Sequence, residues 1–292
     1  MLALRILPRR LSWVAPEKPC QRQFASVPQL YAANPGAPKN TEHVRQVDQH
    51  LRDSGIVKIE LQFADDNCSY LRQLLLQLHK YHDHGLPTTH SASRGWFWDV
   101  RPQLDPRTDA YIARSETMSQ FPWHTDCSYE KAPARYFALQ VIQPDKCGGG
   151  TLSVLETARL VSLLSPSVLE ALGQPEFRIN VPPEFLKEES VTHVVGKLLQ
   201  VNDKPRTTQL RFREDIITPL TKTAKVAFEE LQRALASDDI QSRVVRLTSS
   251  MLPRGSIIAM DNRRWLHGRD EVLDPNRYLR RVRWDARPFN DL

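Results

Sequence analysis

A histidine and an aspartate stand two positions apart in the motif His124-Thr125-Asp126. Side chains two positions apart on extended backbone point to the same side, so His124 and Asp126 can reach one metal ion while Thr125 faces away. Imidazole nitrogen and carboxylate oxygen are both ligands of divalent transition metals. For an isolated pair, a histidine hydrogen-bonded near the start of a strand is the better explanation, because the chain has nine histidines.

A third ligand candidate is His267, at the end of an expected strand far downstream. Two imidazoles and one carboxylate on one face of an octahedral ion leave three positions open, and iron(II) oxygenases use this arrangement to admit a cosubstrate and oxygen. The sequence therefore predicts an iron site formed by His124, Asp126 and His267. A group of three histidines near the end of an expected helix is predicted to be solvated or capping rather than ligating: His79, His82 and His84.

Arginines are concentrated from Arg277 to Arg283, downstream of His267. A cosubstrate with two carboxylates can bind the metal through one end and needs a cation at the other, and guanidinium groups bind carboxylates bidentately. Arg277 is the candidate for that cation. Alternation places Arg277, Leu279, Arg281 and Arg283 on one face. If that face is inward its arginines require anions, and if it is outward they are solvated; the alternation fits both.

The elements that position these residues are short and mixed. Helical spacing of apolar residues or capping signals predict helices at residues 41–51 and 66–82, two short ones between 156 and 173, and a long one at 219–236 with Pro219 in its first turn. Segments rich in apolar and aromatic residues predict strands at residues 55–61, 135–141, 255–260, 263–267 and 277–284, with another after the glycines at 148–150. The aromatic segment at residues 85–102 is expected to be a partly buried loop.

This order of elements predicts an α+β fold, with a double-stranded β-helix (jelly-roll) core and surrounding helices. Regular βαβ alternation is absent, and the glycines at 148–150 lack the spacing of a dinucleotide-binding loop, which disfavours a Rossmann fold. A chain of 292 residues is long enough for one large domain. We expect that domain at residues 42–292, preceded by a linker at residues 26–41 that contains Pro35, Gly36 and Pro38.

The first 25 residues differ from the rest of the chain. They carry Arg5, Arg9, Arg10 and Arg22 among apolar residues, with Glu17 as the one acid. This composition is typical of a mitochondrial transit peptide, which predicts a mitochondrial location. A disordered N-terminal arm on a cytoplasmic protein is the alternative.

The composition narrows the classes of partner. The net charge is +6, yet basic and acidic residues alternate along most of the chain, so we expect no nucleic-acid partner. No apolar run has the length of a membrane-spanning helix, and the four cysteines contain no CxxC pair, so no membrane partner or disulfide framework is expected. We expect a small-molecule substrate, and both a monomer and a homo-oligomer are compatible with the sequence.

Several motifs occur in one order: Pro-Trp-His-Thr-Asp at residues 122–126, Gly-Gly-Gly-Thr at 148–151, Leu-Arg-Phe at 210–212, and then His267, Arg277 and Arg281. In this combination the chain resembles the taurine dioxygenase-like (TauD/TfdA) branch of the iron(II)- and 2-oxoglutarate-dependent oxygenases, over roughly residues 55–284.

The resemblance implies roles for these residues. His124, Asp126 and His267 would be iron ligands, and Arg277 with Thr151 would bind the distal carboxylate of 2-oxoglutarate. Arg281 matches a second arginine that faces substrate or cosubstrate. The implied reaction uses iron(II), 2-oxoglutarate and O2, releases succinate and CO2, and oxidises a carbon of the substrate, usually by hydroxylation.

The substrate itself is open at this stage. The leading hypothesis is a small anionic or zwitterionic metabolite, such as a carboxylic or amino acid. The alternatives are an oxygenase of the carnitine pathway acting on a trimethylammonium compound, which would require an aromatic cage, and a jelly-roll binding module without catalysis. The residues expected to line the substrate pocket are Trp96, Trp98, Tyr129 and Arg281. Cys127 and Trp123 flank the ligands and are expected to orient them.

Overall fold

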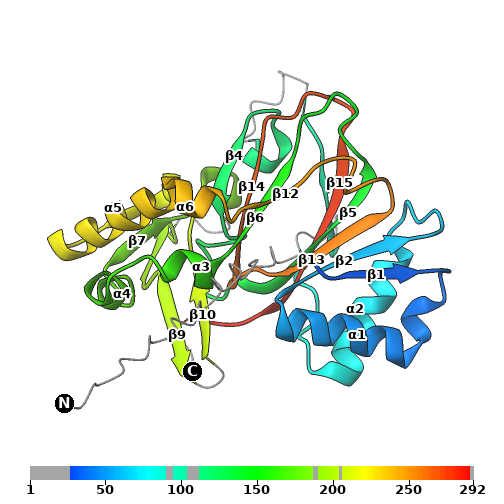
Figure 1. Cartoon of the computed structure of the whole chain (residues 1–292), viewed down its shortest axis with the longest axis horizontal. Helices are drawn as coiled ribbons and strands as arrows, with labels where there is room; N and C mark the ends of the chain where they lie inside the picture. The colour runs from blue at the N-terminus through cyan, green and yellow to red at the C-terminus, as the bar shows by residue number, and fades with distance from the viewer. Residues whose placement is uncertain (1–26, 90–94, 104–111, 187–189, 204–205, 290–292) are drawn as a thin grey trace, which may run out of the picture.

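The computed structural model describes residues 27–89, 95–103, 112–186, 190–203 and 206–289. Two β-sheets form its centre and pack against each other through one shared cluster of buried apolar side chains (Figure 1). The larger sheet has six strands, in the order β1 (Gln29–Ala32), β2 (Ile56–Leu61), β13 (Ser256–Asp261), β5 (Ala134–Gln143), β15 (Tyr278–Ala286) and β3 (Phe97–Val100).

The second sheet has four strands, in the order β12 (Val245–Leu247), β6 (Leu152–Glu156), β14 (Trp265–Arg269) and β4 (Phe121–His124). Neighbouring strands in this sheet are distant in sequence, as in a jelly roll. Two smaller sheets extend from the core: β11 (Ile217–Pro219), β7 (Phe177–Asn180) and β8 (His193–Gly196) in one, and β10 (Arg206–Leu210) with β9 (Leu199–Asp203) in the other.

Helices cover the outer face of each large sheet. The helices α1 (Thr41–Asp53) and α2 (Ser69–His82) share a buried cluster with the six-stranded sheet, on the right in Figure 1. A second cluster joins the four-stranded and smaller sheets to α3 (Thr157–Val161), α4 (Pro166–Leu172), α5 (Lys222–Ala236) and α6 (Asp238–Gln241). Each large sheet is therefore covered by helices on one face and by the other sheet on its other face, so its central strands are buried on both faces.

Strand β5 shows how the sequence satisfies this burial. Its side chains Tyr136 and Ala138 belong to the cluster beneath α1 and α2, whereas Phe137 and Leu139 belong to the cluster between the sheets. A strand covered on both faces is apolar at consecutive positions rather than at alternate ones. The observed architecture is the predicted α+β arrangement of a sheet core with surrounding helices.

The predicted linker at residues 26–41 is wrong over much of its length. Strand β1 pairs in parallel with β2 and completes the edge of the six-stranded sheet, and Ala32 is fully buried. Pro38 lies in a short 3-10 helix (Ala37–Lys39), so the proline- and glycine-rich piece forms a turn into α1. The four residues of β1 are too few to show a strand pattern. The predicted transit peptide at residues 1–25, and the mitochondrial location inferred from it, lie outside the described residues.

Three smaller expectations also change. The long helix begins at Lys222 with Thr221 as its cap, because Pro219 is part of β11. The segment predicted as a loop contains β3. His84 is buried rather than solvated, and its Nε2 lies 3.0 Å from an Asp48 carboxylate oxygen. In the part of the chain that the structure describes, no helix combines the length and the apolar character needed to cross a membrane.

Removal of β1 tests its contribution to stability. Deletion of residues 1–33 should lower the melting temperature relative to deletion of residues 1–26, because only the longer deletion removes the hydrogen bonds between β1 and β2. Loss of about 2 kcal/mol from several such bonds corresponds to a shift of about 4–8 °C in a domain of this size. Circular dichroism melts of both proteins measure the difference, and equal melting temperatures would show that β1 is dispensable.

Candidate metal centre

Two neighbouring strands bring the predicted histidine ligands together. His124 is the last residue of β4 and His267 is the middle residue of β14, and the two are direct partners in the antiparallel pairing of these strands. Directly opposite residues of an antiparallel pair point to the same face. Both imidazoles therefore point into the interior of the roll, where they are almost fully buried.

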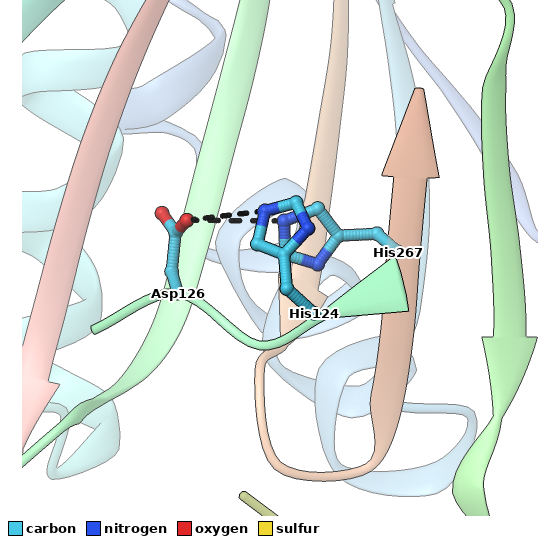
Figure 2. A group of neighbouring side chains, drawn as sticks. All are labelled: His124, Asp126 and His267. Carbon is cyan, nitrogen blue, oxygen red and sulfur yellow. Dashed lines mark ion pairs between the residues drawn. The ribbon is translucent and has the colours of Figure 1, made fainter. Parts of the chain in front are cut away.

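Asp126 reaches the same point from the loop that follows β4. Its Oδ1 lies 3.8 Å from the Nε2 atom of His124 and 3.8 Å from the Nε2 atom of His267. The three potential ligand atoms all lie within 4.8 Å of one another. Figure 2 shows the Asp126 carboxylate facing the two imidazole rings. The structure thus brings together the three residues that the sequence predicts as ligands, from segments separated by nearly half of the chain.

The hydrogen bonds around His124 and Asp126 suit a metal ion. The Nδ1 atom of His124 lies 2.8 Å from the carbonyl oxygen of Pro122, so Nδ1–H donates to it and the Nε2 lone pair faces Asp126. The Oδ2 atom of Asp126 is buried and has no hydrogen-bond partner among the described residues. Two imidazoles and a carboxylate with a spare oxygen are the donor set of an iron(II) facial triad, so these residues fit the ion.

Electrostatics keep the three groups in their metal-binding protonation states. Burial lowers the pKa of His267 to about 4, more than the nearby Asp126 carboxylate raises it. Burial also lowers the pKa of His124 well below its usual value. Burial alone would raise the pKa of Asp126, but the charge of Arg281 and the neighbouring His267 and Arg283 hold it well below its usual range. At neutral pH the site therefore offers two neutral imidazoles and one carboxylate.

Two backbone anchors, which the sequence did not reveal, hold the loop that carries Asp126. Asn262 accepts a hydrogen bond from the Asp126 backbone N–H at 2.7 Å and donates one to the Asp126 carbonyl at 2.8 Å. Phe212, of the Leu-Arg-Phe motif, accepts a hydrogen bond from the Thr125 backbone N–H at 2.7 Å, and its own N–H donates to the Thr125 hydroxyl at 3.1 Å. The loop is therefore fixed from both sides.

Arg277 is buried and lines a cavity that both histidines also line. Burial and the charge of the nearby Arg269 lower the pKa of its guanidinium to about 10, against the opposing effect of Asp145. It remains a cation at neutral pH. Arg269 lines the same cavity and was not predicted; its guanidinium donates to the Thr117 carbonyl at 3.1 Å and to the Ser119 carbonyl at 2.5 Å.

The glycine motif makes room for Arg277. A Cβ atom on Gly150 would lie 2.8 Å from the Nε atom of Arg277, and the backbone there has a positive φ of +66°, so glycine is required on both grounds. Asp145 organises the same turn by accepting hydrogen bonds from the backbone N–H groups of Cys147, Gly149, Leu273 and Asp274. Thr151 follows directly, but Leu152 rather than Thr151 contributes to the cavity lining.

Arg281 contacts the carboxylate ligand itself. Its Nη1 lies 3.2 Å from Asp126 Oδ1, and its guanidinium lies 5.8 Å from the centre of the Trp98 ring. The face of β15 that carries Arg281 therefore points inward, which the alternation alone could not decide. Tyr129 and Cys127 line the cavity beside the metal ligands, as predicted, whereas Trp96 and Trp123 pack in the outer clusters instead. Arg283 lines this cavity from the same face of β15, and lining residues that were not predicted are Ala113, Arg114, Ser115, Phe121, Phe185 and Arg213.

Comparisons with known proteins agree with this geometry. The family model described as "Taurine catabolism dioxygenase TauD, TfdA family" matches residues 28–283. An L-asparagine oxygenase of Streptomyces coelicolor (strain ATCC BAA-471 / A3(2) / M145) is 29% identical over 167 residues, which cover 57% of this chain and 46% of that protein. The match therefore spans a little under half of that relative.

Solved structures share the fold at low sequence identity. An asparagine oxygenase in complex with Fe(II), 2S,3S-3-hydroxyasparagine and succinate superposes with a TM-score of 0.65, at 20% identity, covering 87% of this chain and 92% of that one. The non-heme iron oxygenase OrfP in complex with Fe and alpha-ketoglutaric acid gives a TM-score of 0.62, at 17% identity, covering 88% and 93%. The predicted jelly-roll core is confirmed by these similarities.

The lowered pKa of His267 predicts how the metal-free protein responds to acid. Between pH 6.5 and about 4 the unfolded chain binds a proton that the folded protein excludes, so the free energy of unfolding should fall as the pH falls through this window. The slope is up to about 1.4 kcal/mol per pH unit for each such proton. His267→Gln should reduce this slope in urea titrations with a chelator present, whereas the exposed His193→Gln should not. An unchanged slope in His267→Gln would contradict the assignment.

Proposed function

The chain belongs to the taurine catabolism dioxygenase TauD, TfdA family, and on this premise we propose that it is an iron(II)- and 2-oxoglutarate-dependent dioxygenase. The observation that carries the proposal is one cavity that is lined by His124, His267 and Arg277 together. A metal site and a buried cation in a shared cavity match a cosubstrate that chelates through one end and carries a carboxylate at the other.

Bound iron(II) with 2-oxoglutarate and O2 would supply an oxidative decarboxylation to succinate and CO2 that is coupled to oxidation of a substrate carbon. The chain contributes positions and surroundings. His124, Asp126 and His267 would hold the metal, and Arg277 would bind the distal carboxylate of 2-oxoglutarate. Thr151 does not itself line the cavity, but it directly follows the glycine that lies against Arg277, and its hydroxyl is proposed to donate to the same carboxylate.

Apolar side chains form much of the rest of this lining. They include Val100, Phe137, Leu139, Leu152 and Leu279. Such a lining excludes water and strengthens the attraction between Arg277 and a bound carboxylate. Phe137 also packs against the His267 ring, at 4.5 Å between ring centres, and so helps to orient that ligand. No general base is required by this scheme.

The substrate is proposed to be a small anionic or zwitterionic metabolite that is hydroxylated. The cavity beside the metal ligands is lined by four arginines, Arg114, Arg213, Arg281 and Arg283. Asp126 is the one carboxylate among the described residues of that lining. The positive charge of the arginines attracts acids. The names of the asparagine oxygenase relatives, and of OrfP bound to (3S)-hydroxy-L-Arg, fit an amino acid as the substrate class.

The same arginines disfavour a trimethylammonium substrate. A quaternary cation is bound by aromatic faces without competing positive charge. Tyr129 and Phe185 do line the cavity, but Arg281 and Arg283 lie beside them. A jelly-roll module without catalysis is likewise disfavoured, because all three ligands and the buried Arg277 are present together.

Metal and cosubstrate binding can be tested without knowing the substrate. Anaerobic addition of iron(II) and 2-oxoglutarate to the wild-type protein should produce the weak visible charge-transfer band of a keto acid chelated to iron. Asp126→Ala should abolish the band while leaving the circular dichroism spectrum unchanged, and the exposed Asp239→Ala is the matched control. A full band in Asp126→Ala would remove Asp126 from the ligand set, and absence of the band in wild type would refute the proposed function.

The role of Arg277 predicts a specific defect. Arg277→Gln should raise the 2-oxoglutarate concentration required for half-maximal band intensity by about 10- to 150-fold, because a hydrogen bond to a charged group contributes about 1.5–3 kcal/mol. Arg280→Gln is the control, since Arg280 lies on β15, which begins directly after Arg277, but pairs with Asp99 outside the cavity, at 2.9 Å. An unchanged requirement in Arg277→Gln would transfer the role to Arg281.

A further inference from the structure

Arg283 is a half-buried cation in the cavity beside the metal ligands, and the mechanism above gives it no ligand to bind. It lies on β15, two positions after Arg281, and lines the cavity together with His124 and Asp126. Its Nη1 donates a hydrogen bond to the sulfur of Cys127, the residue that follows Asp126. Its guanidinium therefore lies next to the loop that carries a metal ligand.

The other arginines of this region each have a carboxylate partner. Arg281 pairs with Asp126, at 3.2 Å. Arg213 and Arg114 share Asp215, at 2.9 and 3.3 Å. None of the ion pairs found among the described residues includes Arg283, although the charges of Asp126 and Glu130 act on it from farther away. Its direct hydrogen-bond partner, the Cys127 thiol, is a weak neutral acceptor. Partial burial of a cation without a directly paired anion is costly, so an arginine kept there fits a ligand that brings a negative charge into contact with it.

An aromatic wall lies beside this cation. Tyr129 and Phe185 line the same cavity and stack on each other, with ring centres 5.2 Å apart and planes inclined by 14°. Trp98 extends the wall, with its ring centre 6.1 Å from that of Phe185. A planar cation next to aromatic faces offers one contact for an acidic group and another for the carbon skeleton of a small organic acid.

We propose that Arg283 binds the acidic group of the substrate and thereby selects small carboxylic acids, with their carbon skeleton against Tyr129 and Phe185. The proposal rests on the proposed function, because it places the substrate between this arginine and the metal. It assigns Arg283 a task separate from that of Arg277, which is proposed to bind the cosubstrate. A substrate whose acid group is masked as an ester or amide should then bind poorly.

Anion binding at Arg283 can be measured before the substrate is known. The protein is loaded with zinc(II), as a redox-inert substitute for iron, and saturated with 2-oxoglutarate so that Arg277 is occupied. Sulfate and acetate are then titrated while the melting temperature is followed, since a ligand that binds the folded state raises it. The variants are Arg283→Gln and Arg283→Lys, with Arg280→Gln as the control on the opposite face of β15.

The expected result is a saturable rise in melting temperature in wild type and Arg280→Gln, a smaller one in Arg283→Lys, and none beyond the general salt effect in Arg283→Gln. An equal rise in Arg283→Gln, or no saturable rise in wild type, would overturn the proposal. This readout uses no iron and no turnover. Failure of the proposed function, seen as a missing charge-transfer band, is thus distinguishable from failure of the anion site.

A second readout addresses substrates directly. L-amino acids and phenylacetate, each beside its neutral amide, are screened for stimulation of succinate release from 2-oxoglutarate. Any acid that stimulates the wild-type enzyme should show a KM raised by at least about 10-fold in Arg283→Gln, while the charge-transfer band and the requirement for 2-oxoglutarate stay within about 2-fold of wild type. Equal stimulation by an acid and its amide would contradict the selection of acids by Arg283.

Discussion

The pairing of His124 with His267 across β4 and β14 is the constraint on which the site depends. Because side chains of a strand alternate between its faces, a slip of one residue in this register would turn one imidazole away from the roll interior. The register is set by the strands around it: β14 pairs with β6 on its other side over five consecutive residues. The geometry of the two imidazole ligands therefore depends on the strand register of the four-stranded sheet.

Asp126 is under a different constraint, since it lies in a loop and no strand register fixes it. Asn262 supplies the fixation through two hydrogen bonds to the Asp126 backbone and a third to the Ala134 carbonyl, at 2.9 Å. Asn262 follows β13, so the six-stranded sheet holds the carboxylate while the four-stranded sheet holds the imidazoles. A buried side-chain amide whose bonds are satisfied makes such a connection rigid. The ligand set is complete only when the two sheets are packed together.

The sequence predicts the part of this site that depends on local spacing. The two-residue spacing of His124 and Asp126, and the alternation along β15, are periodic signals that survive folding unchanged. The alternation could not predict which face of β15 points toward the core. That choice is made by β5 and β13, whose apolar residues cover both faces, and no property of the arginine segment itself encodes it. The same limit applies to Asn262 and Arg269, whose partners lie more than a hundred residues away.

The predicted linker failed for a related reason. Strand β1 has four residues, and what makes it a strand is the free edge of β2, with which it pairs from Gln29 to Ala32. An edge strand takes its conformation from its neighbour, so its own sequence carries little pattern. The metal-binding and cosubstrate residues differ from β1, because their chemistry depends on the residue type itself. Their neighbours in the fold only orient the side chains. Residue chemistry was thus readable along the chain, whereas short edge elements and the inner face of β15 were determined by packing between distant segments.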